Sequence, residues 1–264
     1  MTRWGRSRFE NGFVRVTQLF QSPTLSNTDT QIKMLRAWYL IPEIPFAAYA
    51  KCLKPIYEVL EHKNTSKTNP DIFLKTILAA HSGMTVEQWD ALEKARLHQK
   101  ALEMKMGDFH EELLGKFPGY ETLPVGHETG TDVRKTDNSG FLEVKNRDNT
   151  MNSGSADSVV RKLTALTDQG KSATLVLVNS AKKKLPRFKA PAAVRVINGR
   201  QAYTELSGRA TFYDDLLKTI DETFKRYPTY VSLLETAAAD VPLPVPDSPE
   251  PHSQSVCIAS PDSP

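Results

Sequence analysis

The 264-residue sequence predicts an α/β fold in which helices flank a mixed β-sheet, preceded by a helical N-terminal region. Two observations support this prediction. Apolar residues between residues 102 and 117 recur at three- and four-residue steps, which is typical of one face of an amphipathic helix. From Tyr120 onward the apolar residues instead form short alternating or continuous runs separated by turn-forming residues, as strands do.

The first 83 residues are expected to form short helices. Their apolar stretches Ile32–Ile41 and Phe46–Leu60 are broken by prolines and followed by a polar segment. We therefore expect a helical N-terminal region over residues 1–83, an α/β core over 84–240 and a flexible tail over 241–264. The tail is rich in proline and serine, a composition that buries too little apolar area to offset the entropy of ordering.

A long helix opens the predicted core. Thr85 and Gln88 fit a capping box, and the helix continues to about Lys116, where Pro118-Gly119 ends it. Its expected buried face consists of Leu102, Met106, Phe109, Leu113 and Phe117.

Three strands, a helix, two strands and a final helix follow the long helix. The second and third strands are joined by a turn at Thr136–Gly140. The expected ranges are strands at Tyr120–Val125, Thr131–Lys135 and Phe141–Asn146, a helix at Ala156–Leu166, strands at Thr174–Val178 and Ala193–Ile197, and a helix at Tyr213–Leu234.

Composition limits the class of protein. There are two cysteines, too few for a disulfide framework, and no apolar run approaches the ~20 residues of a membrane span. We therefore expect a cytoplasmic protein without membrane segments. The formal charge is +3, and residues 241–264 contain three acidic and no basic residues, which leaves the remainder at +6. This surplus slightly favours nucleic acid as a partner.

The residues that indicate chemistry are Asp132, Glu143 and Lys145. Because side chains alternate along a strand, Glu143 and Lys145 point to one face, while Leu142 and Val144 point to the other. If the two strands pair antiparallel through the intervening turn, Asp132 comes close to Glu143 on the same face.

Two carboxylates and an ammonium group held on rigid strands suit a hard divalent cation. Mg²⁺ takes one or two carboxylates, keeps several waters and completes its shell with phosphate oxygens. Such an ion activates water and stabilises the leaving oxygen of a phosphodiester, while Lys145 would orient the water or offset charge on the phosphorus. The sequence therefore predicts phosphodiester hydrolysis with Asp132, Glu143 and Lys145 as catalytic residues.

Asp132, a ten-residue gap and Glu143-Val144-Lys145 resemble the active-site motif of the PD-(D/E)XK nuclease superfamily. The stretch from Glu143 to Ser155, preceded by Gly107–Glu111, resembles type II restriction endonucleases, particularly those that cut GGNCC-like sites. The similarity spans about Leu102 to Lys162. One residue departs from the pattern, because Thr131 stands where the superfamily label has proline.

The resemblance implies a restriction-endonuclease-like core with a further metal-binding carboxylate on the helix before the first strand. Glu111 and Glu112 both qualify. We favour Glu111, because it lies four residues after Gly107, whose missing side chain would let the helix approach the sheet. The expected metal ligands are then Asp132, Glu143 and Glu111.

Polar and basic residues after the third strand are candidates for contact with DNA. Asn146, Asn149, Asn152 and Ser155 directly follow the predicted catalytic strand, although a serine at 153 or 155 also suits a helix N-cap. Lys183 belongs to the densest basic run, Lys182–Lys189, which suits the phosphate backbone.

The expected function is Mg²⁺-dependent cleavage of double-stranded DNA at a short specific site by a type II restriction endonuclease. A palindromic target would match a homodimer, and the resemblance implies a DNA methyltransferase as the physiological partner. Two alternatives remain open: a repair nuclease or junction resolvase with the same core, and a non-catalytic DNA-binding module in which the three charged residues form a salt bridge.

Overall fold

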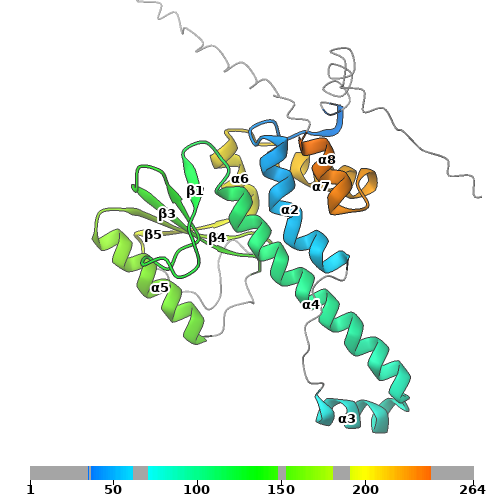
Figure 1. Cartoon of the computed structure of the whole chain (residues 1–264). Helices are drawn as coiled ribbons and strands as arrows, with labels where there is room; N and C mark the ends of the chain where they lie inside the picture. The colour runs from blue at the N-terminus through cyan, green and yellow to red at the C-terminus, as the bar shows by residue number, and fades with distance from the viewer. Residues whose placement is uncertain (1–34, 36, 62–70, 148–152, 181–190, 239–264) are drawn as a thin grey trace, which may run out of the picture.

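The computed structural model describes residues 35, 37–61, 71–147, 153–180 and 191–238. A five-stranded mixed sheet forms its centre, with helices on both faces (Figure 1). The strands, in spatial order, are β1 (Tyr120–Thr122), β2 (Val133–Lys135), β3 (Gly140–Lys145), β4 (Ser172–Leu177) and β5 (Val194–Asn198). Neighbours from β1 to β3 are antiparallel and those from β3 to β5 are parallel. The predicted α/β fold with a mixed sheet is confirmed.

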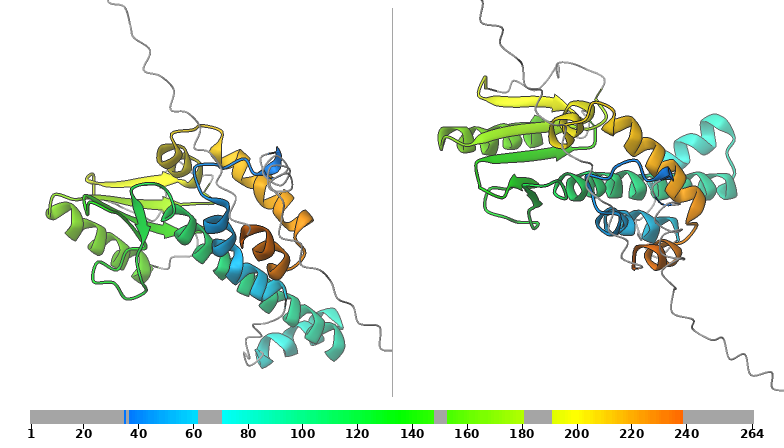
Figure 2. Two further views of the ribbon diagram at one scale, coloured as in Figure 1. Left: turned by 45° about the horizontal axis from the view of Figure 1, so that its top comes forward. Right: turned by 90° about the horizontal axis from the view of Figure 1, so that it is seen from above.

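Alternating side chains divide the core into two layers. On one face, α5 (Ser153–Asp168) covers the sheet and packs Leu163 and its apolar neighbours against Phe141 and Leu175. On the other face, Leu142 and Val144 pack under the remaining helices. The views in Figure 2 show α5 separated from those helices by the sheet.

The long helix α4 (Val86–Leu114) follows the predicted pattern. Thr85 and Gln88 form the capping box, with the two backbone–side-chain bonds at 3.3 and 2.9 Å. Phe109, Leu113 and Phe117 are buried, while Leu102 and Met106 are partly buried against the same core. The C-terminal half of α4 therefore anchors the helix to the sheet.

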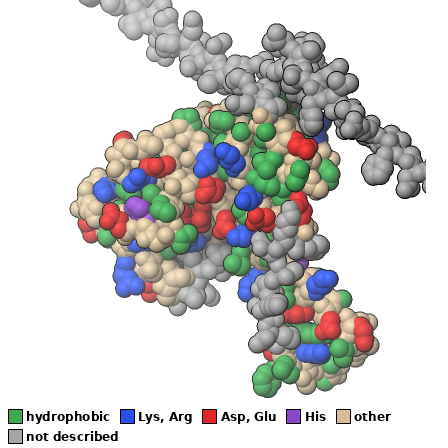
Figure 3. Space-filling model, in the orientation of Figure 1, with side chains coloured by type: hydrophobic (Ala, Val, Ile, Leu, Met, Phe, Trp, Pro, Cys, Tyr) green, Lys and Arg blue, Asp and Glu red, His purple; other side chains and the backbone are tan. Residues whose placement is uncertain are grey.

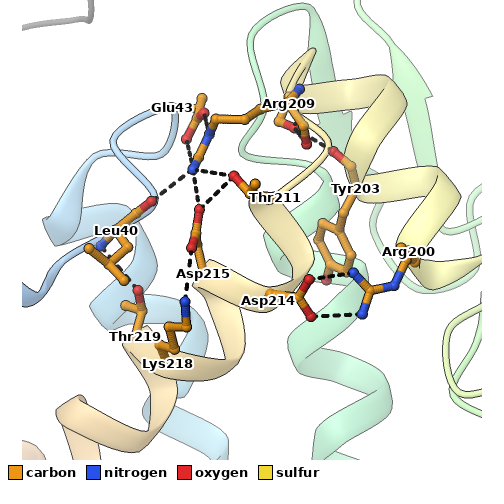
Figure 4. A network of polar contacts seen from close by, with 11 residues as sticks. Leu40, Glu43, Arg200, Tyr203, Arg209, Thr211, Asp214, Asp215, Lys218 and Thr219 are labelled. Atoms are coloured by element: carbon orange, nitrogen blue, oxygen red, sulfur yellow. Dashed lines mark hydrogen bonds and ion pairs between the residues drawn. The ribbon is translucent and has the colours of Figure 1, made fainter.

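The described part of the N-terminal region packs into the larger core layer. The helix α2 (Phe46–Leu60) buries its aromatic residues there, and the hydroxyl groups of Tyr49 and Thr223 hydrogen bond at 3.0 Å. Just before α2, the Arg209 guanidinium donates to Glu43 (2.6 Å) and to the Leu40 carbonyl (2.8 Å) and also pairs with Asp215 (Figure 4). These bonds fix the segment before α2 to the start of α7 (Phe212–Arg226).

The single helix expected at Tyr213–Leu234 is wrong. The structure has two helices there, α7 and α8 (Tyr230–Ala238), because Pro228 lacks an amide hydrogen and restricts the residue before it. A further helix, α6 (Gly199–Ser207), was not predicted. Its sequence signal is Asn198, whose side chain caps the helix by accepting from the Gln201 amide at 2.8 Å.

Other predicted segments differ in length or lie outside the described residues. The first two strands are shorter than expected, since pairing covers only three residues of each. The tail at 241–264 and the basic run at 182–189 are outside the described residues. None of the helices within the described ranges is long and apolar enough to cross a bilayer.

Candidate active site

The pairing of β2 with β3 positions Asp132. This residue directly precedes β2, and its backbone amide donates to the Leu142 carbonyl at 3.0 Å. Its carboxylate oxygen Oδ2 accepts a hydrogen bond of 2.7 Å from the Val144 amide of β3. Both bonds join Asp132 to the strand that carries Glu143, so its side chain is fixed by the backbone.

Lys145 lies between the two carboxylates. Its Nζ is 2.7 Å from Glu143 Oε1 and 3.6 Å from Asp132 Oδ2. The three residues that the sequence singled out are therefore brought together at the C-terminal end of β3, on one side of the sheet. Their assignment as catalytic residues stays a prediction.

Glu143 is almost fully enclosed, with 2% of its side chain exposed. It lies on the face that α5 covers, and Lys162 of α5 places its Nζ 2.5 Å from Glu143 Oε2. Lys162 also donates to the Gly130 carbonyl, at the loop before Asp132. A buried carboxylate of this kind needs compensating charge, which two lysines on opposite sides supply.

Sequence reasoning missed Lys162. A signal for it existed, because Val159, Leu163 and Leu166 form the buried stripe of α5, and Lys162 lies within that stripe. A lysine among buried helix positions indicates an anionic partner in the core.

The Glu143 oxygen that faces Lys162 has an unusual environment. Glu143 Oε2 is buried and, among the described residues, is held by the ion pair with Lys162 at 2.5 Å rather than by a hydrogen bond of normal geometry. A buried oxygen without a hydrogen bond is costly in a folded protein and suits a ligand that is bound during function.

The carboxylates perturb one another electrostatically. Burial and the nearby Glu143 raise the pKa of Asp132, although Lys145 and the Val144 amide oppose the change. Burial would lower the pKa of Lys145, but Asp132 and Glu143 outweigh it, so the net shift is upward. Lys145 is thus held as a cation between the two acids.

Helix α4 contributes Glu111 to the same electrostatic environment. Burial, followed by the charge of Asp132, raises the pKa of Glu111 to about 7. Glu112 instead pairs with Lys116 at 2.9 Å, away from the strand carboxylates. Electrostatic coupling to Asp132 is found for Glu111, and the choice of Glu111 over Glu112 as a metal ligand stays a prediction. The reason given from Gly107 is wrong, since a Cβ there would meet no atom within 4 Å.

The donor set suits a divalent ion that retains water. Among the described residues, no three acidic, histidine or cysteine side chains lie close enough to enclose a metal ion by themselves. Mg²⁺ does not need such a cage, because one or two carboxylates with waters and phosphate oxygens satisfy it. Asp132 and Glu143 fit that requirement, and an ion at Glu143 Oε2 would displace or share the Lys162 ammonium.

Asn146 is one of two predicted DNA contacts that the structure describes. Its Nδ2 donates to the Glu103 carbonyl at 3.4 Å, and its Oδ1 accepts from Asn179 at 2.6 Å. It thereby borders an open cleft of about 540 Å³ between α4 and the ends of β3 and β4, lined by Gln99, Leu102, Glu103, Met106, Asn146, Arg147 and Asn179.

The other predicted DNA contacts are less clearly placed. Ser155 is exposed in the first turn of α5, since that helix begins at Ser153. Asn149, Asn152 and Lys183 lie outside the described residues. Asn146 and Ser155 thus lie shortly before and shortly after residues 148–152, which are outside the described residues.

Comparisons with known proteins identify the family to which the chain belongs. The model of the Eco47II restriction endonuclease family matches residues 47–227, which is more than half of the chain. The chain is also 27% identical over 197 residues to the type II restriction enzyme Sau96I of Staphylococcus aureus, covering 67% of this chain and 73% of that enzyme. The resemblance to type II restriction endonucleases inferred from sequence is confirmed. The expected enzyme class, a site-specific deoxyribonuclease, is confirmed with it.

The raised pKa of Glu111 predicts a pH-dependent effect of Glu111→Gln in protein without divalent metal. Between about pH 4.5 and 7 the folded protein retains a proton that the unfolded chain has lost, so wild-type stability falls as pH rises. Glutamine at position 111 does not titrate, so the variant lacks this pH dependence of stability. The Tm of the variant should exceed that of wild type by a few degrees at pH 7.5 and converge with it near pH 4.5.

Thermal unfolding in a chelator at several pH values measures this difference. Glu112→Gln, which breaks the pair with Lys116, is the control for the adjacent helix position. A Tm difference that is constant across this range, or that has the opposite sign, would contradict the burial of Glu111 near the strand carboxylates.

Proposed function

Because this chain belongs to the Eco47II restriction endonuclease family, and is a type II restriction enzyme acting on double-stranded DNA, we propose that it hydrolyses DNA at a short specific site in a Mg²⁺-dependent reaction. The observation that carries the proposal is the convergence of Asp132, Glu143 and Lys145, in which the buried Glu143 is ion-paired with Lys145 and Lys162.

Asp132 and Glu143 would hold the ion, and Glu111 would join them from α4. Bound Mg²⁺ supplies Lewis-acid stabilisation of negative charge on the phosphate and favours ionisation of water. Asp132 is suited to this role because the Val144 amide occupies only Oδ2. Glu143 is suited because Oε2 accepts no hydrogen bond within the described structure.

Lys145 would bind and orient the scissile phosphate. Its Nζ already lies beside both carboxylates, so a phosphate brought to those oxygens meets a fixed cation. Such a charge, placed before the reaction, stabilises the developing negative charge without reorganisation. Lys162 lies on the α5 side of Glu143, where its ion pair orients the buried carboxylate.

The ends of the segment after β3 would contact the duplex. Asn146 borders the open cleft, and Ser155 lies at the N-terminal turn of α5, where backbone amides and the helix dipole favour phosphate oxygens. By sequence, Asn149 and Asn152 belong to the same contact region and Lys183 to a backbone-binding run.

The finer features of the function are proposed by analogy. A target of the GGNCC kind follows from the sequence resemblance, and a homodimer follows from the two-fold symmetry of such a target. A DNA methyltransferase that protects the same sequence would accompany the enzyme.

The most direct test of the function is digestion of a long DNA of known sequence with the purified full chain. We expect discrete fragments in Mg²⁺ and none in excess chelator, because both carboxylates require a cation to bring phosphate near. Sequencing the fragment ends measures the target and the stagger together. Random degradation, preference for branched DNA, or equal cleavage in chelator would contradict the proposal.

The assignment of residues predicts a separation of cleavage from binding. Asp132→Asn keeps an oxygen that can accept from the Val144 amide, and Glu143→Gln keeps the shape of its side chain. Each variant should lose cleavage by about 1,000-fold or more, yet bind a target duplex within a few-fold of wild type in Ca²⁺.

Initial cleavage rates and equilibrium binding of a labelled duplex measure these two effects. Glu112→Gln is the matched control, because it changes a neighbouring carboxylate that pairs with Lys116, and it should retain cleavage. Cleavage near the wild-type rate by either strand variant would remove that residue from the active site.

A further inference from the structure

A helical arm projects from the body of the protein. We define the arm as residues 71–100, comprising α3 (Ile72–Ser82) and the first half of α4. In Figure 1 and the left view of Figure 2 it stands away from the sheet and the other helices. All residues of α3 are described and none of them is buried.

The arm exposes an unusual amount of apolar surface. Six of the thirteen large hydrophobic side chains that are exposed within the described residues lie on it, and hydrophobic atoms gather at its free end in Figure 3. They are Ile72 (71% exposed), Phe73 (83%), Leu74 (40%), Ile77 (61%), Val86 (54%) and Leu92 (47%). Phe73 and Ile77 are four residues apart, so they form a stripe along one side of α3.

This exposure is costly for a short helix. An isolated helix of 11 residues is marginal in water, and most helical stability in proteins comes from packing an apolar face. The six side chains together expose on the order of 600 Å², compared with ~800 Å² per partner in a standard interface. They lie on several sides of the two helices, so a contact would use the side of α3 that carries Phe73 and Ile77.

The charge of the arm argues against DNA as its partner. Residues 71–100 contain four acidic and four basic side chains, which leaves no surplus of positive charge. Part of this charge is internally paired, because Arg96 donates to both oxygens of Glu93 at 2.6 and 2.7 Å. A surface that contacts the phosphate backbone would instead carry a surplus of lysine and arginine.

We propose that the arm is the dimerisation element and that its partner is the arm of a second copy of this chain. A two-fold contact uses the same patch on both subunits, so one exposed stripe containing Phe73 and Ile77 suffices to form it. This inference rests on the proposed function, in which two subunits each cut one strand.

The continuity of α4 gives the contact a mechanical consequence. The same helix carries Trp89 in the arm and Glu111 beside the strand carboxylates, about 30 Å apart along its axis. Because α4 is uninterrupted, an arm-to-arm contact sets the distance and angle between the two active sites. The spacing of the two cuts in DNA would then depend on residues far from either phosphate.

The test compares the self-association of the full chain with that of Phe73→Glu/Ile77→Glu. Sedimentation equilibrium without DNA or metal should show a wild-type dimer and a variant whose dimer dissociation constant is on the order of 100-fold weaker or more. Leu217→Glu and Val231→Glu place the same charge on exposed apolar positions outside the arm, and both should remain dimeric. Because α3 buries no side chain within the subunit, the variant should keep its fold and have the same Tm as wild type diluted to the monomer.

A second measurement does not depend on the variant. On dilution of wild type, hydrogen exchange of the α3 amides should accelerate together with dissociation. A wild type that is monomeric at tens of micromolar would overturn the proposal, whether residues 1–34 or another protein covers the arm instead. Unchanged association of the double variant would also overturn it.

Cleavage assays separate this proposal from the function on which it rests. If the arm variant is monomeric, it should nick plasmid DNA but produce double-strand breaks far more slowly than wild type at equal concentration. A dimeric wild type that cuts no DNA would refute the proposed function while leaving the arm contact intact. Normal cutting by a variant that remains dimeric would refute the arm contact alone.

Discussion

The hydrogen bond from the Val144 amide to Asp132 is the constraint on which the site depends. It fixes one carboxylate to the backbone of the strand that carries the other, so the two acids cannot separate without breaking strand pairing. Repulsion between them is offset by Lys145 on the open side and by Lys162 on the side of α5. The sheet thereby maintains a concentration of charge that free side chains in water would avoid.

The burial of Glu143 strengthens its interactions with cations. A carboxylate with 2% exposure is shielded from water, so its interactions with nearby cations are stronger than they would be at the surface. Oε2 is held by the Lys162 ammonium at 2.5 Å without hydrogen-bond geometry, so an ion that binds this oxygen has to displace or share that lysine. Stability and function are opposed here, because a fully hydrogen-bonded carboxylate would cost less to bury but would bind an ion less readily.

Local sequence patterns predicted much of the fold. The capping box at Thr85, the apolar stripe of α4 and the alternation around Glu143 each depend on neighbouring residues, and the structure reproduces them. The break at Pro228 was missed because helical spacing on both sides gave more weight to periodicity than to one proline. Helix α6 was missed because its main signal is a single capping side chain, Asn198.

The part of the site that lies on the hairpin of β2 and β3 could be predicted from the sequence. Asp132, Glu143 and Lys145 meet through a short turn, so strand alternation and register sufficed to place them. Lys162 and the orientation of Glu111 depend on how two helices pack against the sheet, and residue spacing within a helix does not specify that packing. The position of Lys162 in the buried stripe of α5 indicates an anionic partner, but only the packing of α5 over β3 identifies that partner as Glu143.

The location of a bound ion tests the central claim most directly. Crystals of the protein with a target duplex and Mn²⁺, measured at the manganese absorption edge, would show the ion by anomalous scattering. We expect a peak within about 2.3 Å of oxygens from both Asp132 and Glu143, including Oε2. An ion bound elsewhere, with Glu143 still enclosed between its two lysines in the presence of DNA, would contradict it.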